Sequence, residues 1–95
     1  MKLNVDGQDV RMNAFVNRII TNTVESVLLS LDDIPASPQS VVFRADSQAG
    51  VELVIDGAPV RMNAFVQKFV GNLLQGIVAS LEDIPAAPGS IEVVL

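Results

Sequence analysis

The heptapeptide VRMNAFV occurs twice in this chain, at residues 10–16 and again, letter for letter, at residues 60–66. Sliding the sequence against itself by 50 positions aligns residues 2–45 with residues 52–95 without a gap, and 19 of the 44 aligned pairs are identical. Self-similarity at a fixed period is the signature of an internal duplication. We therefore expect one domain, 1–95, built from repeats 2–45 and 52–95 that are joined by a short turn at 46–51.

Each repeat opens with a pattern that predicts a β-hairpin. The pairs Asp6-Gly7 and Asp56-Gly57 lie between alternating apolar positions, and a two-residue Asp-Gly loop favours a type I′ turn. The second hairpin contains Pro59, which has no backbone N–H to donate to a neighbouring strand. We expect that arm at an edge of the sheet.

A helix and a strand follow each hairpin. Asn13 and Asn63 are good N-cap residues, and apolar residues then recur at three-and-four spacing over about 18 residues, which predicts a helix with one buried face. Each helix must end before an Ile-Pro pair, because proline disfavours the helical conformation of the preceding residue. Final strands are predicted at 40–44 and 91–95.

The order of these elements predicts an α+β fold of tandem ββαβ units. A repeat of about 45 residues buries too little surface to be stable alone, so both should share one sheet of about six short strands, with two helices on one face and a pseudo-twofold axis. Without the short hairpin arms, the order strand-helix-strand-strand-helix-strand resembles the split βαβ pattern of ferredoxin-like domains. The alternative is an intertwined sheet in which the hairpin of one repeat completes the other.

Composition narrows the classes of function. Apolar residues make up 49% of the 95 residues, enough for a core, while charged residues make up only 18%. The net charge of -5 argues against a nucleic-acid partner. The chain has no apolar run typical of a signal peptide or a membrane span, so we expect a cytoplasmic protein that does not bind membranes.

The residues that most enzymes use are missing. The chain contains no Cys and no His, so it lacks thiolate chemistry, the commonest general base and the commonest metal ligand. No phosphate-binding glycine loop is present, and we expect no catalytic residues, no metal and no cofactor. Stacking of nucleobases is also not expected, because Phe15, Phe65 and Phe69 are predicted to lie on the buried helix faces.

Repeated charged residues form the first candidate site. Arg11 and Arg61 precede a helix N-terminus, and Asp33 and Asp83 follow a helix C-terminus, so both signs oppose the helix dipole. One interpretation is that each Asp forms a turn leading into Ile-Pro and each Arg is simply exposed. If the helices run antiparallel, the alternative is two symmetric ion pairs, Arg11 with Asp83 and Arg61 with Asp33.

A third interpretation treats the same ends as an anion site. Arg11, Asn13, Arg61 and Asn63 would bind an anion or a small molecule at the helix N-termini, at the junction of the repeats.

The second candidate site is an almost uncharged strip on the outer face of the second helix. The strip consists of Gln67, Lys68, Gly71, Asn72, Gln75, Gly76 and Ala79. Surface helices usually carry many charged pairs, whereas this strip includes two glycines, which each cost about 1 kcal/mol relative to Ala in a helix interior. Charge depletion is typical of an interface core, although the glycines could instead allow a close crossing of the first helix. The candidate interface residues are Asn72, Gln75, Gly76 and Ala79.

These patterns favour a non-enzymatic module that associates with itself or with a protein partner. The alternative function is a small-molecule or anion-binding protein with its site at the junction of the repeats. A hydrolase that uses Asp33 and Asp83 as paired carboxylates is the weakest hypothesis, since a turn explains both residues.

Overall fold

The computed structural model describes residues 1–32, 34–82, 84 and 88–95. Its elements are named here in chain order: β1 (Lys2–Val5), β2 (Gln8–Asp9), α1 (Ala14–Leu29), β3 (Val41–Asp46), β4 (Gly50–Ile55), β5 (Ala58–Val60), α2 (Ala64–Ala79) and β6 (Ser90–Val94).

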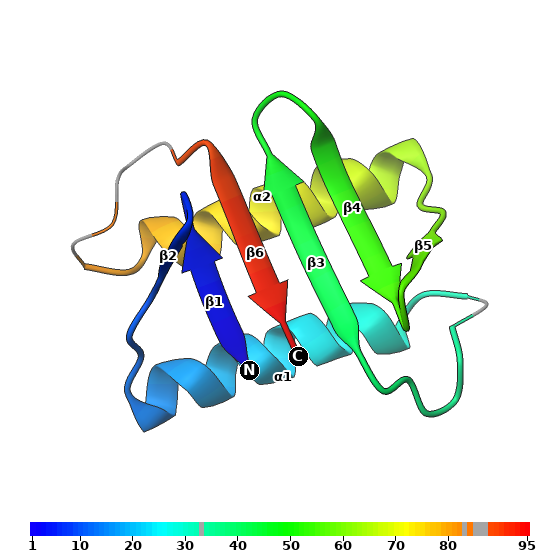
Figure 1. The fold of residues 1–95 in the computed structure, drawn as a ribbon, viewed down its shortest axis with the longest axis horizontal. Helices are drawn as coiled ribbons and strands as arrows, with labels where there is room; N and C mark the ends of the chain where they lie inside the picture. Colours follow the sequence, from blue (N-terminus) through cyan, green and yellow to red (C-terminus); the bar gives the residue numbers. More distant parts are fainter. Residues whose placement is uncertain (33, 83, 85–87) are drawn as a thin grey trace.

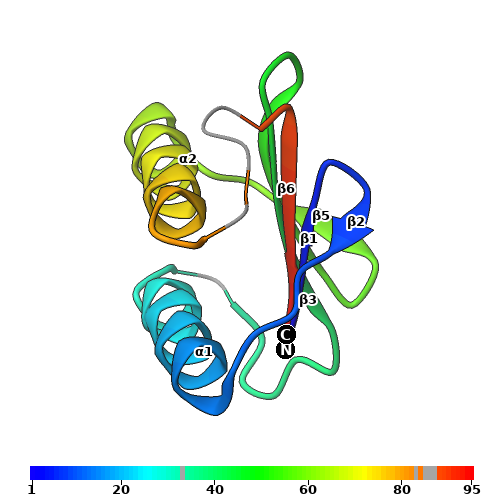
Figure 2. The ribbon, with the colours of Figure 1, turned by 90° about the vertical axis from the view of Figure 1, so that its left-hand side faces the viewer.

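All of the strands belong to one antiparallel sheet with the order β2-β1-β6-β3-β4-β5. Both helices lie on the same face of that sheet and run in opposite directions, and the chain termini lie side by side (Figures 1 and 2). Neither described helix lies on the other face, and the β2 and β5 arms lie on that side (Figure 2). The predicted α+β class, with two helices on one face of a six-stranded sheet, is confirmed.

The strands pair between the repeats. Hairpin β1-β2 pairs with β6, hairpin β4-β5 pairs with β3, and β3 and β6 pair at the centre. The hairpin of each repeat therefore completes its sheet with the final strand of the other repeat, which is the intertwined arrangement that the sequence left as an alternative. Because of this exchange, neither repeat contains the partner strand that its own hairpin needs.

Both Asp-Gly turns have the backbone geometry that the sequence predicts. The φ angles are 51° and 84° at Asp6 and Gly7, and 50° and 81° at Asp56 and Gly57. Two successive positive φ angles are the requirement of a type I′ turn. Pro59 lies in the edge strand β5, as expected, where its missing N–H removes no bond to a further strand.

The helices begin where the sequence predicts and end slightly earlier. The side chains of Asn13 and Asn63 accept hydrogen bonds from the N–H groups three residues later, both at 2.8 Å. Each helix has 16 residues rather than about 18. At Ser30 and Ser80 the N–H group donates to the carbonyl three residues back, which is the pattern of a tighter 3₁₀ turn. The helices therefore end several residues before the Ile-Pro pairs.

The connection between the repeats is a tighter turn than expected. Asp46 and Gly50, predicted to lie in a turn at 46–51, pair across β3 and β4, and β3 and β6 likewise differ by one or two residues from the predicted strands. The Asp46 carboxylate accepts the N–H groups of Ala49 and Gln48 at 2.9 and 2.8 Å. These two hydrogen bonds hold the pKa of Asp46 below its ordinary value of 3.8, and the bond from Ala49 has the larger effect.

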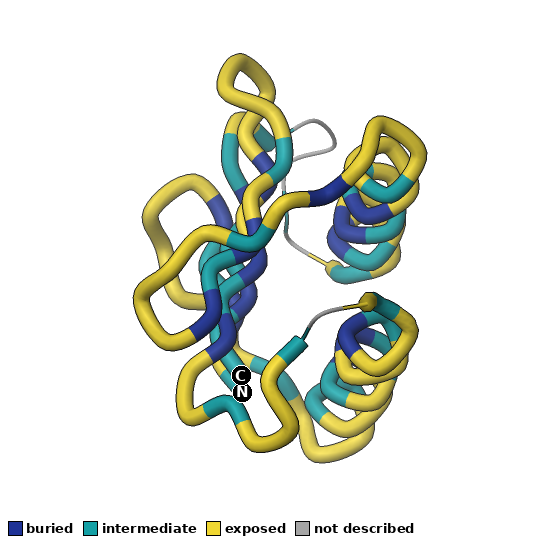
Figure 3. Tube along the Cα trace, turned by 90° about the vertical axis from the view of Figure 1, so that its right-hand side faces the viewer, coloured by how far each residue is buried: buried dark blue, intermediate teal, exposed yellow. Residues whose placement is uncertain are grey.

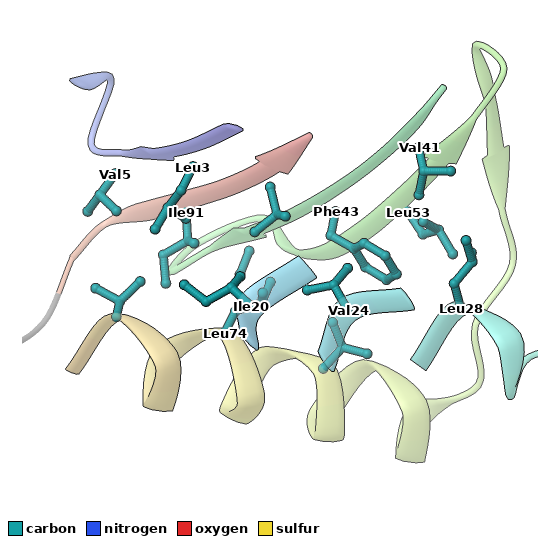
Figure 4. Close-up of a cluster of buried hydrophobic side chains, with 14 of the residues drawn as sticks. Leu3, Val5, Ile20, Val24, Leu28, Val41, Phe43, Leu53, Leu74 and Ile91 are labelled. Carbon is teal, nitrogen blue, oxygen red and sulfur yellow. The ribbon is translucent and has the colours of Figure 1, made fainter. Parts of the chain in front are cut away.

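The core is one apolar layer between the sheet and the helices (Figure 4). Each helix places one narrow stripe on the sheet, and the inner helix face is buried while the outer face is exposed (Figure 3). The stripes occupy equivalent positions in the two repeats: Ile20, Val24 and Leu28 in α1, and Val70, Leu74 and Val78 in α2.

The expectation that Phe15, Phe65 and Phe69 are buried is wrong. Their exposed fractions are 64%, 74% and 50%. At about 100° per residue, nine residues separate opposite sides of a helix, so Phe15 lies opposite the buried Val24 and Phe65 lies opposite the buried Leu74. The apolar residues of each helix cover more of its circumference than the sheet covers, and the phenylalanines lie on the uncovered part.

Candidate functional site

A groove runs between α1 and α2 on the side of the helices that faces away from the sheet. It consists of two half-grooves of about 640 and 570 Å³. One half is formed by the N-terminal part of α2 and the C-terminal part of α1, and the other half is formed by the reverse combination. The first is lined by Ile19, Asn22, Thr23, Ser26, Val27, Ser30, Leu31, Phe65, Val66, Phe69 and Leu73. The second is lined by Phe15, Val16, Ile19, Ile20, Thr23, Asn72, Leu73, Gly76, Ile77, Ser80 and Leu81.

Large apolar side chains line this groove although water reaches them. Of the large hydrophobic side chains that are exposed in the described chain, Phe15, Ile19, Phe65 and Phe69 belong to the groove and Leu29 does not. The rings of Phe65 and Phe69 are one turn apart and stack with centroids 6.1 Å apart. Exposed apolar side chains that gather in one groove make this face the candidate binding surface of the described chain.

Among the described residues, none that lines either half-groove is charged. The described charges of the two helices, Arg18, Glu25 and Lys68, are exposed and lie outside the lining. An aromatic, uncharged centre with charges at its margin is the composition of an interface core and its rim.

The four residues predicted to form an interface are all exposed. Asn72 and Gly76 line the groove, whereas Gln75 and Ala79 are exposed beside it. A Cβ added at Gly76 would meet no atom within 4 Å. A close crossing of the first helix therefore does not explain this glycine.

The other glycine of α2 has a structural role. A Cβ added at Gly71 would lie 3.1 Å from a Cγ of Val51 on β4. Gly71 thus allows α2 to lie close to the sheet, and the expectation that it belongs to the outer strip is wrong.

The candidate Arg and Asn residues do not come together. Asn13 and Asn63 cap their helices, and Arg11 and Arg61 are exposed just before them. Because the helices are antiparallel, the two N-termini lie at opposite ends of the helix layer (Figure 1). The four residues therefore occupy two separate places.

The surroundings of Arg11 are acidic. It lines a hollow of about 450 Å³ together with the carboxylates of Asp6, Asp9 and Glu82. Negative charge at this end of α1 opposes an anion there. Between described residues, both ion pairs belong to Arg44. Asp33 and Asp83 lie outside the described residues, so their predicted pairs with the two arginines stay predictions.

Two features were missed by reasoning from sequence, and the first is a pair of carboxylates that join the repeats. Asp6 Oδ1 accepts the N–H groups of Gly89 and Ser90 at 2.8 and 2.9 Å. Asp56 Oδ1 accepts the corresponding N–H groups of Gln39 and Ser40, both at 2.8 Å. The signal in the sequence is that both turns use Asp, although Asn suits a type I′ turn equally well.

The second missed feature is a charge cluster on the open face of the sheet. Arg44 Nε donates to Glu92 Oε2 at 2.7 Å, and its Nη1 lies 3.9 Å from Glu52 Oε2. The hydrogen bond and the charge of Glu92 raise the pKa of Arg44 above its ordinary value. The cluster links three strands because Arg44 is paired with Glu52 across β3-β4 and with Glu92 across β3-β6, a spacing that only the strand order reveals.

The described residues contain no candidate metal-ligand cluster and no candidate membrane-spanning helix. No group of three His, Cys, Asp or Glu side chains in it could hold a metal ion. Neither described helix is long and apolar enough to cross a membrane. Comparison with protein-family models, with curated proteins and with solved structures found no match.

Proposed function

We propose that this chain is a non-enzymatic protein-interaction module whose contact surface is the outer face of its two helices. The observation that carries the proposal is the groove, in which Phe15, Ile19 and the two phenylalanines of α2 are at least half exposed. All lining residues that the structure describes are uncharged. Aromatic side chains account for much of the binding energy at protein interfaces. Their exposure in both repeats at equivalent positions supports a shared role in binding.

We also infer that the chain is a fused duplicate with pseudo-twofold symmetry. Equivalent residues form the same turns, the same caps, the same buried stripes and the same carboxylate contacts, always displaced by 50 positions. β6 lies between β1 and β3, and β3 lies between β6 and β4. When the short arms β2 and β5 are left out, each helix therefore connects two strands that are separated by a third. This connectivity supports the proposed likeness in pattern to the split βαβ of ferredoxin-like domains.

The sheet edges are poor contact surfaces in comparison. β2 has only two residues, and β5 has three, of which one is Pro59. Short edge strands and edge prolines prevent the addition of another strand. This contrast favours the helix face.

A small apolar molecule is the second candidate for the groove. Both repeats line each half-groove, and its volume of about 640 Å³ lies within the roughly 300–1,000 Å³ of known ligand sites. Such a ligand would bind at the junction of the repeats, between the helices and away from the arginines.

The test combines molar mass with binding of an apolar probe. Light scattering over a concentration series, with refractive-index detection because the chain lacks Trp and Tyr, reports self-association. Fluorescence of 8-anilinonaphthalene-1-sulfonate reports an accessible apolar surface. If the native chain self-associates, the double variant Phe65→Ser/Phe69→Ser should no longer do so. If the native chain binds the fluorescent probe, the double variant should no longer bind it.

The matched control is Val54→Thr, a change of similar volume on the open face of the sheet. It should leave both signals unchanged. Native protein that neither associates nor binds the probe, or a double variant that behaves as the native chain does, would refute the proposed function.

A further inference from the structure

We infer that the occupant of the groove is a second copy of this chain, packed helix layer against helix layer with a twofold axis between the copies. The inference rests on the proposed function and identifies the partner. Its support comes from the shape, the charges and the area of the helix face.

The face is self-complementary in shape. In each half-groove the N-terminal part of one helix supplies the protruding side chains, Phe65 and Phe69 in one half, and Phe15 and Ile19 in the other. The C-terminal part of the opposite helix protrudes less. In the second half-groove its exposed residues are small or polar, among them Gly76, whose Cβ position is open, while its Leu73, Ile77 and Leu81 are partly buried. Stacking two copies with antiparallel helices places the protruding half of one helix over the C-terminal half of another.

The charged residues beside the groove are complementary when two copies stack with antiparallel helices. Arg18 lies four residues after the start of α1, Lys68 lies four residues after the start of α2, and Glu25 lies four residues before the end of α1. When α1 stacks antiparallel on α1 of the second copy, Glu25 lies beside Arg18 of that copy. When α1 stacks on α2 of the second copy, Glu25 lies beside Lys68. Opposite signs meet in both registers and like charges do not.

The face is large enough for a stable dimer. The helix layer covers one broad side of a molecule that measures 36 × 30 × 20 Å, with the short axis across the layers (Figures 1 and 2). A standard interface buries about 800 Å² on each partner. Contact over most of the broad side provides that area, and the groove lies at its centre, where contacts that exclude water contribute most.

The experiment measures the dimer dissociation constant of the full chain by sedimentation equilibrium. We expect Glu25→Lys to weaken the dimer about tenfold, since the twofold axis applies each charge reversal twice. Either Arg18→Glu or Lys68→Glu, added to Glu25→Lys, should restore the native constant, and the one that does so identifies the register. Asp9→Lys makes the same change of net charge on an edge strand and should have no effect.

The aromatic residues provide a second, larger readout. Phe65→Ser/Phe69→Ser should weaken the dimer at least thirtyfold, as expected for residues at the centre of an interface. Both phenylalanines are at least half exposed in the monomer, so circular dichroism should show an intact fold.

The second-copy proposal fails if the native chain is monomeric up to about 1 mM. It also fails if the chain dimerises and neither Glu25→Lys nor the phenylalanine variant changes the dissociation constant. The proposed function can survive these results, because a monomer whose groove still binds 8-anilinonaphthalene-1-sulfonate, and loses it in Phe65→Ser/Phe69→Ser, retains a binding surface for a different partner.

Discussion

Replacing Asp6 with alanine removes a side-chain contact that joins the two repeats. The carboxylate accepts two backbone N–H groups from the start of β6, at Gly89 and Ser90. Residue 6 also has a φ of 51°, a conformation that costs alanine roughly 1–2 kcal/mol. The substitution therefore removes an acceptor and introduces backbone strain at the same position.

The size of the effect follows from these two contributions. Hydrogen bonds to a charged group contribute about 1.5–3 kcal/mol when buried. Asp6 is exposed and water can replace it, so about 1 kcal/mol is expected for the pair of bonds. Together with the strain, Asp6→Ala should cost about 2–3 kcal/mol, which lowers the melting temperature by roughly 10–15 °C in a chain of this length.

Two further substitutions at residue 6 separate the hydrogen-bond contribution from the backbone strain, and a substitution at residue 9 is the control. Asp6→Asn keeps an acceptor oxygen and tolerates positive φ, so its loss should be below about 1 kcal/mol. Asp6→Gly relieves the strain but removes the acceptor, and its stability should lie between those of the Asn and Ala variants. Asp9→Ala, which removes one exposed bond to the Asn4 side chain, is the control and should change stability by less than about 0.5 kcal/mol.

Urea unfolding followed by circular dichroism gives the free energies of unfolding, and amide hydrogen exchange reports the contact itself. In Asp6→Ala the amide protons of Gly89 and Ser90 should exchange faster than in the native chain. The reasoning is refuted if the Ala and Asn variants are equally stable, or if exchange at those two amides is unchanged.

Other predictions concern the helix, the turn between the repeats and the exchanged hairpins. Gly76→Ala should raise the free energy of unfolding by about 0.5–1 kcal/mol through helix propensity, whereas Gly71→Ala should gain less because its Cβ would meet β4 at 3.1 Å; equal gains would contradict the packing described. Gly76→Leu should fold normally and associate more weakly, as light scattering will show. Because the pKa of Asp46 is lowered in the folded chain, its carboxylate stabilises the fold at pH values above the pKa that Asp46 has in the unfolded chain. This stabilisation is lost as the pH falls through the lower pKa of the folded chain. A carbon-13 titration of Asp46 with a midpoint at or above 3.8 would disprove this. Fragments 1–48 and 49–95 should each fail to fold as monomers and should regain native circular dichroism when mixed, because each hairpin pairs with a strand of the other fragment.

Local features could be predicted because neighbouring residues decide them. The turns follow from Asp-Gly, whose backbone accepts positive φ, and the helix starts follow from Asn13 and Asn63, whose side chains reach the N–H three residues later. The almost uncharged strip of the second helix could also be predicted, because a lack of charged residues is evident from the sequence alone. The repeated heptapeptide can now be divided: its asparagine caps the helix and its methionine packs at the core, whereas its phenylalanine faces the groove.

Other features depend on distances that the sequence does not contain. Helical periodicity showed that Phe15 and Phe65 are apolar residues of an amphipathic helix, but their burial depended on how much of the helix the sheet covers. The carboxylate contacts of Asp6 and Asp56 span more than 80 and about 16 positions respectively, so the Asp in each turn does not indicate which N–H groups it accepts.

The sequence by itself determined the number and the type of the elements, because turn chemistry, capping and apolar spacing act over a few residues. Only the tertiary structure decided that each hairpin pairs with the other repeat and that the two helices leave an apolar groove between them. The physical reason is that local rules are satisfied by either repeat alone, whereas strand pairing and burial depend on which surfaces meet. Those surfaces belong to different repeats, as Lys2 of β1 and Val94 of β6 do.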